Sequence, residues 1–145
     1  MALWQYTFNL VPENTIKDKV LIDEDGYFDT SPLWLKSCKK INIFEDIGIL
    51  LPLSESWDTD IVQYGDLNSN CIEIYKNQNF IESASFRINF LSNYKEILKE
   101  IIRICFSEKL LILDEFFNVV PYDFDKIYSV IENSQQKKYY MKLIQ

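Results

Sequence analysis

Alternation of apolar and polar residues predicts a strand near the amino end of the chain. Over residues 3–11 large apolar side chains recur at every second position, which is typical of a half-buried strand. The members of this face are Trp4, Tyr6, Phe8 and Leu10. Pro12 ends the run, because proline lacks the N–H that a strand ladder needs. The apolar run at 20–22 predicts a short second strand.

The middle of the chain predicts a β-hairpin followed by a long helix. Residues 71–75 and 80–90 are strand-like, and the polar residues 77–79 between them favour a turn. The second strand is expected to bury Phe80, Ala84, Phe86, Ile88 and Phe90. Ser92 is expected to cap a helix that runs to about Phe106. The buried stripe of that helix is expected to comprise Tyr94, Ile97, Leu98, Ile101, Ile102 and Cys105.

Less regular elements precede this unit. The pair Ser31 and Pro32 is typical of a helix start, because serine caps the first turn and proline fits the first helical position. Residues 41–51 are mostly apolar and predict a short helix or a loop. Residues 53–66 are rich in Ser, Asp and Glu, yet they include large aromatic side chains. We therefore expect an ordered surface loop there.

The carboxy end predicts two more strands and further helix. Residues 110–113 and 116–120 are strand-like, and Asp123 is expected to cap a helix that follows them. Residues 134–144 are expected to form a helical or frayed tail. Strands and helices are grouped along the chain and do not alternate in βαβ units. We therefore expect a single α+β domain over residues 1–145, with a mainly antiparallel sheet and two or three packed helices.

Composition favours a folded domain without familiar catalytic groups. The 145 residues are 48% hydrophobic and 15% aromatic, which is enough for a core of ordinary size. Histidine is absent, which excludes Ser–His and Cys–His triads and histidine-ligated zinc. The 3 scattered glycines exclude a phosphate-cradling loop. We expect no enzyme activity, no metal and no cofactor.

The cysteines and the apolar segments predict a cytoplasmic protein. Cys38, Cys71 and Cys105 are odd in number and widely spaced, unlike a disulfide framework. Cys71 and Cys105 fall on apolar stretches, so we expect both to be buried as small hydrophobic side chains. No segment approaches the ~18 apolar residues of a membrane span. The first residues lack the basic region of a signal peptide.

Negative charge is confined to the amino half of the chain. The formal net charge is −7, and it divides into −8 for residues 1–73 and +1 for residues 74–145. One acidic cluster comprises Asp23, Glu24, Asp25 and Asp29. A second comprises Glu55, Asp58, Asp60 and Asp66, with Trp57 and Tyr64 among them.

Acidic residues interleaved with aromatic ones suit a surface that binds a basic protein. The charges accelerate encounter with such a partner, and Trp and Tyr are frequent in binding hot spots. We therefore expect the ten residues of the two clusters to contact a partner. The alternative is a surface that only keeps the protein soluble, with Trp57 buried.

Other functions rest on single features. Glu55, Asp58 and Asp60 beside Trp57 would suit a small carboxylate-dependent hydrolase, since sugars stack on tryptophan. The basic and aromatic residues at 137–142 are of the kind that nucleic-acid modules use. However, the acidic balance of the chain opposes binding to nucleic acid or to an anionic membrane. A non-catalytic structural or regulatory subunit is the third alternative.

Residues 53–90 resemble small bacterial immunity proteins, which are encoded beside polymorphic or contact-dependent growth inhibition toxins. The helix after Ser92, the turn at 119–121 and the stretch 131–134 add to the likeness, which covers most of the chain. The resemblance implies a cytoplasmic protein that binds a cognate toxin domain, often a basic nuclease. It would block the active site or the substrate path of that toxin. No residue receives a role from the resemblance, because these families share no common binding motif.

Overall fold

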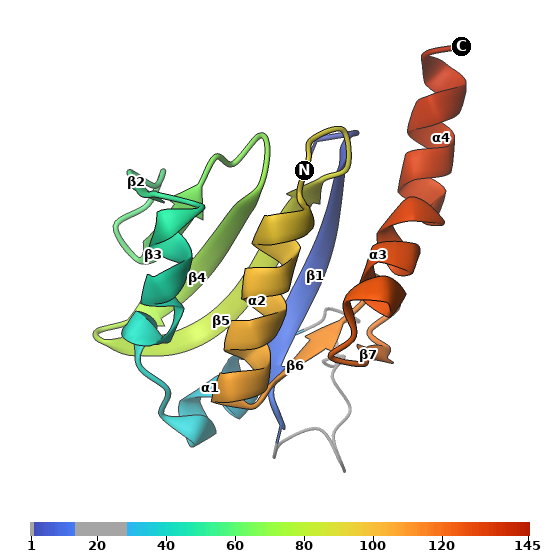
Figure 1. Cartoon of the computed structure of the whole chain (residues 1–145). Helices are drawn as coiled ribbons and strands as arrows, with labels where there is room; N and C mark the ends of the chain where they lie inside the picture. Colours follow the sequence, from blue (N-terminus) through green and yellow to red (C-terminus); the bar gives the residue numbers. More distant parts are fainter. Residues whose placement is uncertain (1, 14–28) are drawn as a thin grey trace.

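A seven-stranded antiparallel sheet is the frame of the computed structural model, which describes residues 2–13 and 29–145 (Figure 1). The strands lie in the order β2-β3-β4-β5-β1-β6-β7, and each neighbouring pair is antiparallel. They are β1 Gln5–Pro12, β2 Leu53–Ser54, β3 Ile61–Gly65, β4 Cys71–Asn77, β5 Phe80–Asn89, β6 Leu110–Leu113 and β7 Val119–Val120. The predicted α+β class with an antiparallel sheet is confirmed.

Helical segments accompany the sheet. They are α1 Ser31–Ser37, the 3-10 helix η2 Ile41–Ile49, α2 Lys95–Glu108, α3 Phe124–Glu132 and α4 Gln135–Leu143. Helix α2 lies over one face of the sheet, between η2 and α3 (Figure 1). The predicted tail at 134–144 is helix α4, and the apolar run at 41–51 forms η2. The strand predicted at 20–22 lies outside the described residues.

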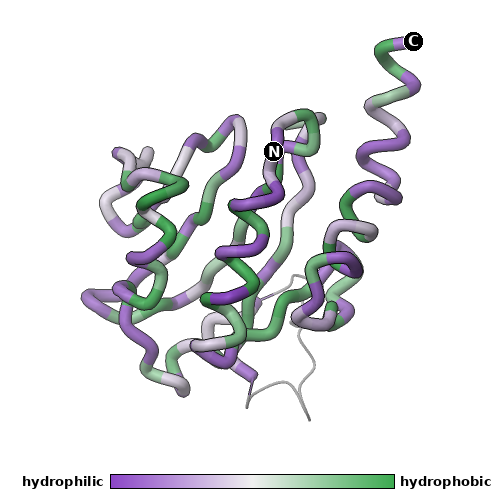
Figure 2. Tube along the Cα trace, viewed as in Figure 1, coloured by the Kyte–Doolittle hydropathy of each residue, from purple (hydrophilic) through white to green (hydrophobic). Residues whose placement is uncertain are grey.

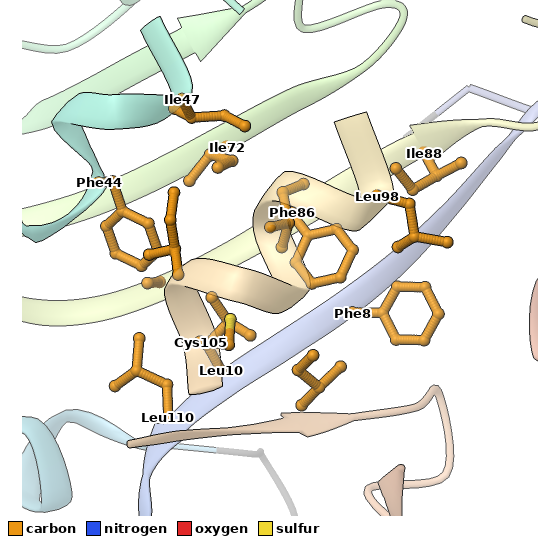
Figure 3. Close-up of a cluster of buried hydrophobic side chains, with 14 of the residues drawn as sticks. Phe8, Leu10, Phe44, Ile47, Ile72, Phe86, Ile88, Leu98, Cys105 and Leu110 are labelled. Carbon is orange, nitrogen blue, oxygen red and sulfur yellow. The ribbon is translucent and has the colours of Figure 1, made fainter. Parts of the chain in front are cut away.

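The core lies between the sheet, α2 and η2. Figure 3 shows its side chains, which include Phe8, Phe86 and Ile88 from the sheet, Leu98 and Cys105 from α2, and Phe44 and Ile47 from η2. Phe8 faces Phe86 across β1 and β5, and the centres of the two rings are 4.9 Å apart. Each large apolar side chain buried in this way contributes about 1.5–3 kcal/mol. Figure 2 shows hydrophobic and hydrophilic positions recurring in turn along α2, as a helix with one buried face requires.

Helix α2 begins three residues after the predicted cap. Tyr94, and not Ser92, precedes the first helical residue, and no side chain caps this end. The hydroxyl of Ser92 donates a hydrogen bond of 2.7 Å to the carbonyl of Asn89, because a tight turn joins β5 to α2. The predicted cap is therefore wrong. The buried stripe contains Tyr94, Leu98, Ile101 and Cys105 as predicted, with Ile104 in addition and with Ile97 and Ile102 only half-buried.

A β-bulge reverses one predicted orientation in the β4–β5 hairpin. The register shifts between Tyr75 and Lys76, which leaves Glu82 as an extra residue in β5. The extra residue moves the alternation by one position, so Ile81 is buried where Phe80 was expected. Phe80 is 38% exposed, and its placement in the core is wrong.

The stretch predicted as a surface loop, residues 53–66, contains β2 and β3. Strand β3 pairs with β4 along its whole length. Its apolar pattern is interrupted by Gln63, which is nonetheless buried. The Gln63 amide donates hydrogen bonds to the hydroxyl of Ser54 at 2.9 Å and to the carbonyl of Gly65 at 3.0 Å. Hydrogen bonding therefore allows a polar side chain to occupy a strand position that alternation alone would not identify.

Helix α1 starts one residue earlier than the predicted cap implies. Thr30 is the residue before the first helical one, and Ser31 is already helical. The carboxylate of Asp29 accepts a hydrogen bond of 3.0 Å from the Ser31 N–H. The predicted capping role of Ser31 is therefore wrong. The Asp29 carboxylate, two residues upstream, accepts the hydrogen bond from a backbone N–H of the first turn instead.

The predicted strand at 116–120 is shortened to β7. Phe117 has a φ of +63°, and the Asp114 carboxylate accepts hydrogen bonds from the N–H groups of Phe116 and Asn118. These contacts fold the first residues of the run into a turn. Asp123 caps α3 through its side chain, as predicted.

Candidate protein-binding surface

The connection between β2 and β3 is ordered by its own short polar side chains. The Asp58 carboxylate accepts a hydrogen bond of 2.8 Å from the Asp60 N–H, and the Ser56 hydroxyl donates one of 2.7 Å to the carbonyl of Ile61. Trp57 lies within this turn and is 65% exposed. An indole held out from an ordered turn contacts a partner at a small loss of conformational entropy.

Three acidic side chains, Glu55, Asp58 and Asp60, lie in this connection without a cationic partner, and a fourth, Asp66, follows β3 at its other end. Glu55, Asp58, Asp60 and Asp66 are all exposed, and none of them forms an ion pair within residues 2–13 and 29–145. Some acids elsewhere in the described chain pair with Lys or Arg, as Glu73 and Glu132 do, whereas others, such as Glu45 and Asp125, form no ion pair there. Like charges gathered at one edge of the sheet repel one another. A partner that brings cations relieves this repulsion.

Exposed apolar side chains lie near Asp66, at the β3–β4 end of this edge. Ile49 is 89% exposed and Leu53 is 66% exposed. Leu50, Leu53 and Asp66 line a hollow of about 510 Å³, together with Ile97. Apolar residues rimmed by charged ones are typical of protein interfaces. Eight residues along the β2–β3 edge of the sheet, from Asp66 at one end to Asp58 and Asp60 at the other, make up what we call the acidic–apolar surface: Ile49, Leu50, Leu53, Glu55, Trp57, Asp58, Asp60 and Asp66.

A second hollow, of about 350 Å³, opens beside the same turn. Asp58, Asp60 and Glu82 line it, with Tyr75 and Lys76 on the β4 side. Burial raises the pKa of Tyr75, and neighbouring carboxylates, Asp58 among them, raise it further. The phenol therefore stays a neutral hydrogen-bond donor. Three carboxylates against one ammonium give the hollow a negative lining, which suits a lysine or arginine side chain of a partner.

The structure brings four of the predicted contact residues together in the β2–β3 connection, namely Glu55, Trp57, Asp58 and Asp60, and it places a fifth, Asp66, at the other end of β3. Tyr64 does not belong with them. It is 7% exposed and packs in the core, because its side of β3 faces η2. Burial raises the pKa of Tyr64, and the charge of Glu45 adds to the effect. Its prediction as a partner-binding residue is wrong.

Of the first predicted cluster, the structure describes only Asp29, which does not lie on this surface. Asp29 is exposed at the start of α1, which packs on β1 and β5. Figure 1 places α1 and β2 at opposite ends of the molecule. Asp23, Glu24 and Asp25 lie outside the described residues.

Sequence reasoning missed four contributors to this region. Ile49 and Leu53 are apolar. Apolar side chains are usually expected to be buried, so the sequence did not predict that these two are exposed. Tyr75 follows the buried Ile74 and so points to the other face of β4. Strand alternation could therefore have predicted its exposure. Glu82 reaches the hollow as the extra residue of a bulge, which the sequence does not reveal.

The predicted burial of Cys71 and Cys105 is confirmed. Cys71 and Cys105 are buried and Cys38 is exposed at the end of α1. Burial raises the pKa of Cys71 to about 11, so this thiol is a poor nucleophile at neutral pH. Within the part of the chain that the structure describes, no three acidic or cysteine side chains come together as metal ligands would.

A third hollow, of about 360 Å³, lies where the β6–β7 turn meets the corner between α3 and α4. Burial and the neighbouring Asp114 raise the pKa of Glu115, and burial raises the pKa of Tyr6 to about 12. The Tyr6 hydroxyl accepts a hydrogen bond of 3.0 Å from the Glu115 N–H, and the Gln136 amide donates one to the Glu115 carboxylate. These contacts fasten α4 to the turn, which gives both groups a structural role.

Among residues 2–13 and 29–145, no helix combines the length and the apolar character needed to cross a membrane. Comparison of the chain with protein-family models, with curated proteins and with solved structures finds no match.

Proposed function

We propose that this protein is a non-enzymatic toxin inhibitor, an immunity protein of a bacterial polymorphic toxin or contact-dependent growth inhibition system. The observation that carries the proposal is an exposed tryptophan on an ordered turn that also holds three exposed acids, Glu55, Asp58 and Asp60, with no ion-pair partner in the described chain. Protein–protein interaction through this surface, and not catalysis, is its function.

The mechanism is occlusion of the active site or of the substrate path of a basic, nuclease-type toxin domain. The carboxylates of the acidic–apolar surface take the place of substrate phosphates against the lysines and arginines of the toxin. Trp57 and Leu53 provide desolvated anchors beside these charges. Electrostatic attraction accelerates the encounter, and apolar contact slows dissociation.

The proposal includes a cytoplasmic location, where the inhibitor meets a toxin that has entered the cell. Its partner is the cognate toxin domain, with no nucleic acid or membrane involved. The chain as a whole is acidic, with a net charge of −7, which favours a basic protein over a polyanion.

Co-expression with the polypeptide encoded by the neighbouring reading frame tests the proposal. The tagged protein is expected to retain that polypeptide on an affinity resin and to release it as the ionic strength of the elution rises. Cells that express the neighbouring polypeptide alone are expected to stop growing, and co-expression is expected to restore growth. No retention, together with growth that neither gene affects, would overturn the proposal.

A pair of matched variants shows which surface protects the cells. Reversal of two charges in Asp58→Lys with Asp60→Lys is expected to abolish protection at low inhibitor levels. The control, Glu96→Lys with Asp125→Lys, makes the same change in net charge at exposed positions of α2 and α3 and is expected to protect like the wild type.

A further inference from the structure

Helix α4 is an exposed, positively charged arm. None of its residues is buried, and it extends past the end of the sheet (Figure 1). Lys138 and Lys142 are exposed and form no ion pair in the described part of the chain. Tyr139, Leu143 and Ile144 are also exposed. Figure 2 shows hydrophilic and hydrophobic positions mixed along the arm, so α4 presents cations and apolar side chains together.

The base of α4 is fixed to the body of the molecule. Ser134 caps the helix by accepting a hydrogen bond of 3.2 Å from the Lys137 N–H. The Lys137 ammonium pairs with the Glu132 carboxylate, and the ring of Tyr140 meets that of Phe90 edge-on at 5.9 Å. The arm therefore projects in a set direction, which reduces the entropy lost when it docks.

The acidic–apolar surface has the complementary composition. It offers four unpaired acids beside exposed aliphatic and indole side chains, whereas α4 offers unpaired lysines beside tyrosine and aliphatic side chains. The two features are far apart along the strand order. The surface lies at the β2 edge of the sheet, whereas α4 packs beside β1, with β3, β4 and β5 between β2 and β1 (Figure 1). They therefore cannot meet within one molecule.

We propose that α4 of one copy docks on the acidic–apolar surface of a second copy of this chain. The pairing is head-to-tail, so each copy still offers one free arm and one free surface, and oligomers grow with protein concentration. The inference rests on the same surface as the proposed function. Self-association then keeps that surface covered until a tighter basic partner displaces the arm.

Sedimentation velocity over a wide concentration range tests the inference on the chain alone. The wild type is expected to sediment faster as its concentration rises. Two variants, Lys138→Glu with Lys142→Glu and Asp58→Lys with Asp60→Lys, are each expected to weaken self-association at least tenfold. The control, Lys36→Glu with Lys126→Glu, changes the net charge as the α4 variant does at exposed positions of α1 and α3. It is expected to associate like the wild type.

Mixing the two charge-reversal variants gives the decisive result. The acidic arm of one variant then matches the basic surface of the other, and the remaining basic arm matches the remaining acidic surface. The mixture is expected to associate more strongly than either variant does alone. A wild type that stays monomeric at all concentrations, a dimer that neither reversal affects, or a mixture that stays monomeric would each overturn the inference.

These outcomes are independent of the proposed function. If the wild type is monomeric but still retains a basic toxin, the docking inference is wrong and the inhibitor proposal stands. If the wild type self-associates but retains no toxin, the inhibitor proposal is wrong and the docking inference stands.

Discussion

Gly65 occupies a backbone conformation that other residues rarely adopt. Its φ is +87°, and a Cβ added there would lie 2.3 Å from the carbonyl oxygen of Asn70. That oxygen accepts a hydrogen bond of 3.1 Å from the Asp66 N–H, which closes the turn between β3 and β4. A residue without a Cβ is therefore needed to close the turn that carries Asp66.

Replacing Gly65 with alanine is expected to lower the free energy of unfolding by about 2–4 kcal/mol, through strain and the backbone clash. The matched control is Gly48→Ala, since a Cβ at Gly48 meets only a ring carbon of Tyr64 at 4.0 Å. The control is expected to stay within about 1 kcal/mol of the wild type. Urea denaturation measures the free energy of unfolding of both variants. Equal losses would contradict the conclusion that position 65 requires glycine.

Substitution of Trp34 and of Trp57 is expected to separate the effect on stability from the effect on binding. Trp34 is fully buried and donates a hydrogen bond of 3.0 Å to the carbonyl of Leu10, so Trp34→Ala is expected to lose about 3–5 kcal/mol of stability. Trp57→Ala is expected to change stability by less than about 0.5 kcal/mol, because the side chain is exposed. It is expected to weaken toxin binding by about 2 kcal/mol, roughly thirtyfold. Titration calorimetry measures the second effect, and unchanged affinity would remove Trp57 from the interface.

At the scale of elements, Glu132 joins α2, α3 and α4. Its carboxylate accepts a hydrogen bond of 2.9 Å from the Tyr94 hydroxyl and pairs with the Lys137 ammonium. Burial by itself would raise the pKa of Glu132. The hydrogen bonds from Lys137 and Tyr94, with the charge of Lys137, outweigh burial and lower the pKa below its ordinary value of 4.5.

Glu132→Gln is expected to lose about 1–2 kcal/mol of stability at neutral pH, because the charged hydrogen bonds are weakened. Since folding lowers the pKa, this stabilisation is present above about pH 4.5 and is lost as the pH falls through the lowered folded value. The difference between wild type and variant is therefore expected to shrink in acid. Urea denaturation over a pH series measures it, with Glu55→Gln as an exposed control, and a pH-independent difference would contradict the account.

Periodicity identified those elements in which one face is apolar throughout. Strand β1 and helix α2 meet that condition, and both were predicted, although α2 starts later than expected and β1 begins only after Trp4 and includes Pro12. Strand β3 was missed because Gln63 satisfies its buried amide by hydrogen bonds. Phe80 was misplaced because the bulge at Glu82 depends on how two strands pair. Local pattern cannot report a change of register that arises between strands.

The candidate surface was predictable only where its residues are close together in the sequence. Its acids and Trp57 are neighbours in the chain, so composition alone grouped them. Tyr75 and Glu82 join them only through the pairing of β3, β4 and β5, which the sequence does not show. Tyr64 was assigned by proximity in sequence, but strand alternation turns its side chain into the core.

At the scale of the whole molecule, charge is separated across the sheet. The unpaired acids lie at the β2 edge, and the unpaired lysines of α4 lie beyond β1 (Figure 1). The net charge of −7 repels polyanions at long range and attracts a basic protein toward the acidic edge. This distribution makes association kinetics the most direct report on how the surface acts.

The rate of association with the basic toxin domain, measured by stopped flow over a series of ionic strengths, tests this account most directly. The wild-type rate is expected to fall steeply with salt, and Asp58→Lys with Asp60→Lys is expected to associate about tenfold or more slowly, with a flattened salt dependence. Glu96→Lys with Asp125→Lys, which matches its net charge, is expected to stay close to the wild type. An unchanged rate and salt slope in the Asp58 and Asp60 variant would contradict the account.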